Sequence, residues 1–252
     1  RRFPLNANLQ FASQGVPELW NPLTGTGKPA NFHQSVGEQT RVHIDLPAAG
    51  SVFVIFRKRE SKANFTRMDR NGETLVDLMD PQRVDRNPPQ TAQGLKPGEP
   101  LQPFVENPPL SAEVLDDGQR LIAWQGGTYQ LRRADQSIAK FTVEGLPAIP
   151  INGPWKLSFP PGWDTPPQID LPELKPWSAL ADPATRAFSG SATYTCEVNL
   201  EAPAAGTRYL LDLGRVSAIA EIAVNGKPAC TLWGPPFRAD ITPHLVSGVN
   251  EI

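Results

Sequence analysis

Apolar and polar residues alternate with a period of two along much of this 252-residue chain, which is the pattern of half-buried β-strands. The clearest run spans residues 191–200, where every even position is apolar and every odd position is polar. One face of such a strand packs and the other meets water. Further strands are expected at residues 8–13, 40–46, 51–57, 63–70, 73–78, 112–115, 120–124, 128–132, 139–143, 155–159, 209–213 and 220–224. The pattern predicts an all-β chain.

Turn residues indicate how neighbouring strands connect. Asn71-Gly72 and Asn225-Gly226 each follow one alternating run and precede another, and Asn-Gly readily adopts positive φ at both centres of a type I′ turn. Two tight hairpins are therefore predicted. Residues 40–46 and 51–57 are expected to form a third hairpin across residues 47–50. Both faces of 51–57 are apolar, which predicts a strand lying between two layers.

Proline-rich segments suggest where the chain divides. Residues 81–109 hold eight prolines and few large apolar side chains, so they are expected to form an extended connector over a surface. Residues 145–152, with Pro147 and Pro150, form the best internal boundary. The resulting division is 1–58 as part of a β-sandwich, 59–148 as a small antiparallel unit with the connector, and 149–252 as a further β domain.

The order of several short segments resembles a known family. In the last domain these are LDLG (211–214), AEIAVNG (220–226), LWGPPF (232–237), DIT (240–242) and GVN (248–250). They resemble the galactose-binding-like, sugar-binding jelly roll of large glycoside hydrolases, and most closely the C-terminal part of bacterial α-L-rhamnosidases of glycoside hydrolase family 106. PELWNPLTG (17–25), SVFVIFR (51–57), GPW (153–155) and FSG (188–190) extend the resemblance over most of the chain.

This resemblance implies a fold, a context and a cellular location. Residues 149–252 would form a jelly roll whose structural signature includes Asn225, Gly226, Asp240 and Thr242, and whose final strand would continue beyond Ile252. Residues 1–58 would follow a catalytic barrel on the same polypeptide. That barrel would hold the acid and base carboxylates and a calcium site, and the parent protein would be exported to the periplasm or the extracellular space.

Local chemistry also accounts for the segment at residues 240–243. Thr242 is expected to cap a single helical turn with Pro243 at its first position, and Asp240 to accept backbone N–H bonds in its loop. No catalytic role is assigned to either residue.

Charge and composition exclude some partners. The formal net charge is −2 without a long single-sign run, so neither nucleic acid nor an anionic membrane surface is favoured. No apolar run approaches the roughly 20 residues of a membrane span. The 28 prolines and 20 glycines are typical of many short strands joined by turns.

Motifs for catalysis or metal binding are missing from the sequence. There is no nucleophile elbow, no phosphate loop and no metal-binding His pair, so no catalytic residue, metal ligand or cofactor is assigned. Asp116 and Asp117 are interpreted as turn formers, because catalytic carboxylates must converge. Cys196 and Cys230 are interpreted as buried or half-buried thiols, with a disulfide between them as the alternative.

Carbohydrate is the expected ligand, and aromatic residues are the candidates for binding it. Trp163 and Trp177 lie in a long, proline-rich loop predicted at residues 160–183, and Trp233 and Arg238 flank a Pro-Pro turn. Indole rings can stack on the C–H faces of pyranosides. The alternative is that Trp163 and Trp177 plug the open end of the sandwich, since large aromatic side chains are mostly buried.

Together these observations predict accessory, non-catalytic β domains of an α-L-rhamnosidase-like, inverting glycoside hydrolase that acts on rhamnose-containing glycans. One alternative is an autonomous carbohydrate-binding module. The other is a purely structural β-sandwich, which burial of Trp163, Trp177 and Trp233 would favour.

Overall fold

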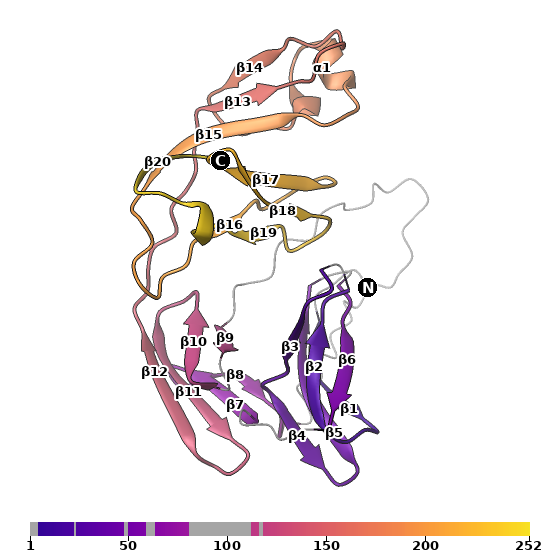
Figure 1. The fold of residues 1–252 in the computed structure, drawn as a ribbon, viewed down its shortest axis with the longest axis vertical. Helices are drawn as coiled ribbons and strands as arrows, with labels where there is room; N and C mark the ends of the chain where they lie inside the picture. The colour runs from indigo at the N-terminus through magenta and orange to yellow at the C-terminus, as the bar shows by residue number, and fades with distance from the viewer. Residues whose placement is uncertain (1–4, 23, 48–49, 59–63, 81–111, 116–117) are drawn as a thin grey trace. The chain divides into compact units, whose positions relative to one another are not determined.

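The computed structural model describes residues 5–22, 24–47, 50–58, 64–80, 112–115 and 118–252. Strands make up nearly all of the regular structure, which confirms the all-β prediction (Figure 1). The chain divides into two compact units, residues 1–147 and 148–252, and each is described by itself. The predicted connector at 81–109 and the turn at Asp116-Asp117 lie outside the described residues.

The first unit begins with two three-stranded antiparallel sheets. One has the order β1-β5-β4 and the other β3-β2-β6. Buried Ala30, Val42 and Ile44 form the core between them, with partly buried apolar side chains contributed by β1, β2 and β6. The strands are β1 (Leu5–Phe11), β2 (Val16–Trp20), β3 (Gly27–Pro29), β4 (His33–Val36), β5 (Gln39–Leu46) and β6 (Phe53–Arg57).

The hairpin predicted between residues 40–46 and 51–57 is wrong. β5 pairs with β1 and β4, whereas β6 pairs with β2 in the other sheet. β5 and β6 therefore belong to different sheets. The prediction that this strand lies between two layers holds only for its inner face. Phe53 on the outer face of β6 is 63% exposed.

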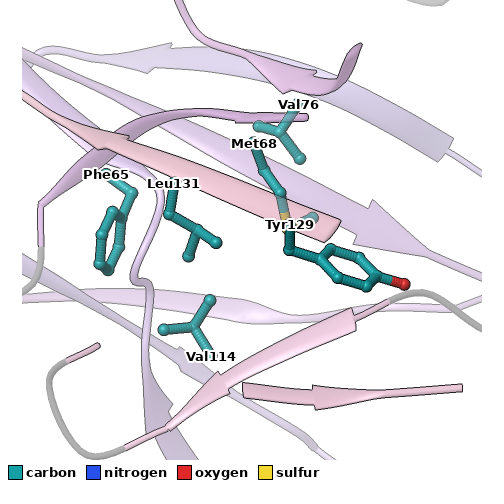
Figure 2. Close-up of a cluster of buried hydrophobic side chains, with 6 residues drawn as sticks. All are labelled: Phe65, Met68, Val76, Val114, Tyr129 and Leu131. Atoms are coloured by element: carbon teal, nitrogen blue, oxygen red, sulfur yellow. The ribbon is translucent and has the colours of Figure 1, made fainter. Parts of the chain in front are cut away.

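A four-stranded antiparallel sheet completes the first unit, with the order β12-β11-β7-β8. The predicted turn at Asn71-Gly72 is confirmed, with φ of 50° and 86°. The separate pair β9–β10 faces the same core. The strands are β7 (Phe65–Arg70), β8 (Glu73–Asp77), β9 (Ala112–Leu115), β10 (Arg120–Ala123), β11 (Gly127–Arg133) and β12 (Ile138–Val143). Figure 2 shows the buried cluster that these strands share: Phe65, Met68, Val76, Val114, Tyr129 and Leu131.

The second unit holds a four-stranded sheet, β14-β13-β15-β20, and two paired ribbons, β16–β19 and β17–β18. Its apolar residues form two clusters, one around Leu157 and Phe188 and the other around Ile222 and Val224. The elements are β13 (Trp155–Ser158), β14 (Gln168–Leu171), η2 (Trp177–Ala179), α1 (Pro183–Ala187), β15 (Thr193–Leu200), β16 (Leu210–Asp212), β17 (Ala220–Val224), β18 (Lys227–Leu232), β19 (Arg238–Asp240), η3 (Thr242–His244) and β20 (Gly248–Glu251).

Two expectations for this unit have clear outcomes. The hairpin at Asn225-Gly226 is confirmed, because both residues have positive φ, 53° and 72°, between the paired strands β17 and β18. The long loop expected at 160–183 is partly wrong. It contains β14, which pairs with β13, and the short helix η2, and α1 follows at its end.

Candidate functional site

Four aromatic rings meet beside the sheet of the second unit, and Phe188 is at their centre. Its ring lies 5.0 Å from the rings of both Phe159 and Trp163 and 5.9 Å from that of Trp177, in edge-to-face geometry. Trp177 in turn stacks on Tyr194. The structure thus brings Trp163 and Trp177 together around one buried ring, in the edge-to-face geometry that aromatic pairs prefer.

Hydrogen bonds around α1 hold this aromatic cluster in place. The Asp182 carboxylate caps α1 by accepting the backbone N–H of Thr185 at 2.7 Å, with Pro183 at the first turn. Phe188 follows the helix, and its carbonyl accepts the indole N–H of Trp177 at 3.2 Å. The Tyr194 hydroxyl donates to the carbonyl of Lys175 at 2.8 Å. The rings are therefore fixed from several directions.

Exposure separates the two tryptophans. Trp177 is half-buried, and its indole N–H already donates to the carbonyl of Phe188. Trp177 is therefore a structural part of the aromatic cluster. Trp163 is 52% exposed while one side of it rests on Phe188. Trp163 therefore presents a supported ring surface to solvent.

Phe188 was not a candidate site residue in the sequence, although Phe-Ser-Gly at 188–190 was one of the segments that carried the resemblance. One nearby residue in the sequence indicates that the Phe188 ring is closely packed, because Gly190 lies against this ring. A Cβ added at Gly190 would stand 2.7 Å from the Phe188 ring. The glycine is therefore required by the aromatic packing.

Trp233 and Arg238 lie on a different part of the second unit. Trp233 follows β18 and is 65% exposed, and among the described residues it makes no ring contact. Arg238 starts β19 and forms an ion pair with Asp212 of β16, with 2.7 Å between Nε and Oδ2. A cis bond between Pro235 and Pro236 shapes the loop between them. Arg238 is thus held by a carboxylate, while Trp233 projects outward.

Asn225 does more than form a turn. Its backbone N–H donates to the carbonyl of Glu251 at 2.8 Å, and its Oδ1 accepts the N–H of Glu251 at 3.0 Å. Its Nδ2 donates to Oδ1 of the fully buried Asn250 at 2.9 Å and to the carbonyl of His244 at 3.0 Å. These bonds fasten the β17–β18 turn to strand β20, so this residue has a structural role.

The cap expected at Thr242 is wrong. The helical turn η3 begins at Thr242 itself, and the residue before it, Ile241, makes no side-chain cap. The Thr242 hydroxyl instead accepts the backbone N–H of Tyr209 at 2.8 Å, joining this turn to β16. Asp240 accepts the N–H of Thr242 at 3.0 Å, and its other carboxylate oxygen lies 3.5 Å from Arg208.

Asp69 and Asp77 lie close together on the outer face of the four-stranded sheet β12-β11-β7-β8, and Arg67 lies between them. The guanidinium is 2.7 Å from Asp69 and 3.1 Å from Asp77. Hydrogen bonds from Arg67 are the main cause that lowers the pKa of Asp69, and Thr74 adds another. A catalytic acid needs the opposite shift, because it must hold its proton near neutral pH. This pair is therefore an ion-paired cluster.

The described ranges contain no candidate metal cluster and no candidate membrane-spanning helix. No group of three His, Cys, Asp or Glu side chains gathers there. Cys196 and Cys230 are free thiols, and burial raises the pKa of both. Within the same ranges, no helix has the length and apolar character needed to cross a membrane.

Comparison with known proteins places similar sequences and folds in long glycosidase chains. No family model matches this chain. A protein of Formosa agariphila named "Putative beta-glucuronidase" is 36% identical over 143 residues, which are 55% of this chain and 12% of that protein. The structure of a rhamnosidase from Novosphingobium sp. PP1Y matches all of this chain with a TM-score of 0.61, at 23% identity, and this covers 17% of that rhamnosidase. At this identity the likeness is one of fold. The chain spans less than a fifth of the length of either protein.

Proposed function

We propose that this chain forms non-catalytic accessory β domains of a glycoside hydrolase of the α-L-rhamnosidase type, acting on rhamnose-containing glycans. The observation that carries the proposal is the agreement of two independent comparisons. The sequence match and the whole-chain fold match are to two different proteins. Each match covers a small part of a long chain named as a glycosidase. The main partner is then a catalytic barrel on the same polypeptide, in an exported protein, and residues 149–252 would form the jelly roll.

The chemistry of the described residues agrees with an accessory role. Glycoside hydrolysis uses two carboxyl groups that flank the scissile bond, one of them with a raised pKa. Asp69 and Asp77 instead share one guanidinium, which lowers the pKa of Asp69. The described residues also gather no metal-binding group, so the calcium implied by the resemblance is not assigned to them.

Hydrolysis of aryl glycosides tests this proposal. The purified chain is expected to release no nitrophenol from p-nitrophenyl α-L-rhamnoside or p-nitrophenyl β-D-glucuronide above the buffer rate. Turnover of either substrate by the chain itself, removed by substitution of one of its own carboxylates, would overturn the accessory role.

A second candidate function is glycan binding by the second unit, and Trp163 is the observation that favours it. An indole that is 52% exposed and supported by Phe188 offers a flat, fixed surface to the C–H face of a sugar ring. Because Trp163 and Trp233 are both well exposed, the purely structural alternative is less favoured. Trp177 contributes the wall of the same cluster, and Trp233 with Arg238 would form a separate contact.

Affinity electrophoresis in gels that contain a rhamnose-rich polysaccharide, such as rhamnogalacturonan I, tests the binding candidate. Trp163→Ala is expected to weaken retention roughly fivefold or more, the loss of about 1 kcal/mol that marks an important contact. Leu174→Ala is the matched control, since Leu174 is a similarly exposed apolar residue between β14 and η2. Equal retention of the wild type and both variants would exclude Trp163 as the contact.

A further inference from the structure

Strand β6 in the first unit is an edge strand with apolar side chains on both faces. Val54 and Phe56 pack into the core between the two sheets. Phe53 and Ile55 point to the opposite face, where Phe53 is 63% exposed and Ile55 is half-buried. β6 pairs with β2 on one side, and among the described residues no strand pairs with its other side. The unpaired backbone groups of an apolar edge strand can form hydrogen bonds with a further strand.

The direction of the backbone groups on that edge follows from β2. The carbonyl of Pro17 accepts the N–H of Ala30 at 2.9 Å, so Pro17 bonds on the β3 side. Successive residues of a strand bond to opposite sides, which directs Glu18 toward its partner Ile55 in β6. Ile55 therefore bonds back to β2. The N–H and C=O groups of Val54 and Phe56 then point to the open edge.

The usual protections of an edge strand are lacking here. Natural edges carry inward charges, lysines, prolines or bulges that prevent pairing. The ladder between β2 and β6 has no register shift, and β6 contains no proline and no lysine. Its single charged residue, Arg57, lies at the end of the strand, 3.2 Å from the carboxylate of Glu18. Within the described part of the chain, the edge is therefore regular and unpaired over Phe53–Arg57.

We propose that a second copy of this chain pairs with the open edge of β6, antiparallel and with the twofold axis at Ile55. In this register Ile55 faces Ile55 of the second copy, and Val54 faces Phe56 of the second copy. Val54 and Phe56 of both copies then exchange main-chain hydrogen bonds through the groups that point outward. Ile55 occupies the non-hydrogen-bonded position, where opposite Cα atoms approach to about 4.5 Å.

The side chains favour a second copy as the occupant, because Phe-Val-Ile-Phe-Arg complements itself about Ile55. On the inner face, Val54 meets Phe56, so the apolar core continues across the axis. On the outer face, Arg57 of one copy lies opposite Phe53 of the other, which permits a cation–π contact. The two Arg57 side chains stay at opposite ends of the pair, so no like charges face each other.

Cross-linking tests this arrangement at its axis. Ile55→Cys is expected to give a disulfide-linked dimer under mild oxidation, since the spacing at Ile55 suits a disulfide. Ile138→Cys is the matched control, because Ile138 is an exposed isoleucine on β12, the edge strand of another sheet. Cross-linking of Ile55→Cys alone supports the proposal. Equal cross-linking of the two variants, or none in either, overturns it.

Sedimentation equilibrium tests the same interface without a covalent bond. The wild-type chain is expected to approach twice its 27.5 kDa mass as its concentration rises. Ile55→Lys, which places two ammonium groups face to face, is expected to remain a monomer, while Ile138→Lys still dimerises. A wild type that stays monomeric up to its solubility limit contradicts the proposal. If Ile55→Lys fails to fold, the cysteine pair decides the question alone.

Discussion

His33 is a buried histidine that should make the first unit sensitive to acid. Its Nδ1–H donates to the carbonyl of Ala30, with 2.7 Å between the two atoms, and the residue is buried at the start of β4. Burial lowers the pKa of His33 below its usual value of about 6.5, against a smaller opposite effect of the hydrogen bond. At a pH between the lowered pKa of His33 in the folded chain and its usual pKa in the unfolded chain, the unfolded chain binds more protons than the folded chain. The free energy of unfolding therefore rises with pH in this window.

The expected result is a loss of stability as the pH falls below about 6.5. His33→Asn removes the titrating ring and retains an N–H donor near the Nδ1 position. Urea unfolding of wild type and variant at about pH 7.5 and about pH 5.5 measures the effect on either side of the usual histidine pKa. The variant should lose less stability on acidification than the wild type. Equal losses would show that His33 does not contribute.

The buried side chain of Asn250 in the second unit accepts two hydrogen bonds and donates two. It is fully buried, and its Oδ1 accepts from Asn225 Nδ2 at 2.9 Å and from the N–H of Val246 at 2.8 Å. Its Nδ2 donates to the carbonyls of Val246 and Gly248, both at 2.9 Å. Asn250→Ala should lower the free energy of unfolding by about 2–4 kcal/mol, because four hydrogen bonds of a fully buried side chain are lost.

Asn199→Ala is the control for this prediction. Asn199 is exposed on β15, opposite Val249 in the strand that carries Asn250. Chemical denaturation should find its stability within about 0.5 kcal/mol of the wild type, as is usual for surface substitutions. Similar stabilities for the two variants would remove the structural role given to Asn250.

At the scale of elements, the turn at Asn225-Gly226 provides a test of backbone strain. Gly226 has φ of 72°, and a Cβ added there would meet no atom within 4 Å. Any cost of Gly226→Val therefore arises from the left-handed backbone conformation, and should be about 1–2 kcal/mol. Thermal melting measures it.

Gly234→Val controls for the added side chain. A Cβ at Gly234 would also meet nothing within 4 Å, and its φ lies outside the left-handed region. This variant should melt close to the wild type. If both valine variants lose the same stability, the cost does not come from the turn.

The sequence predicts local elements better than their partners. Alternation located β15, and Asn-Gly located the hairpins β7–β8 and β17–β18, because these depend on neighbouring residues. The pairing of β6 with β2 depends on contacts between distant segments, so a nearby turn suggested the wrong partner, β5. β14 was missed since its alternation covers only four residues among many prolines.

The candidate site shows the same limit. The sequence identified Trp163 and Trp177 as aromatic candidates, but it gave no distance between them and no means to tell which is exposed. Their common contact with Phe188 arises from the fold of residues 160–190, which includes α1 and its cap. Thr242 was predicted as a cap from its neighbour Pro243, whereas its actual contact, Tyr209, is distant in sequence.

In the accessory role that we propose, each of the two β units supplies a surface and the chemistry belongs to another domain. The first unit offers the open edge of β6, and the second offers the supported ring of Trp163. The two surfaces belong to different units and share no residue. Loss of glycan binding in Trp163→Ala should therefore leave cross-linking through Ile55→Cys unchanged.

Hydrolysis of p-nitrophenyl α-L-rhamnoside by the purified chain is the most direct test of the non-catalytic role. The measurement should include Asp69→Asn and Asp77→Asn, since these two carboxylates converge on Arg67. If the proposed accessory role is right, the wild type and both variants release nitrophenol only at the buffer rate. Turnover by the wild type that either variant abolishes would contradict it.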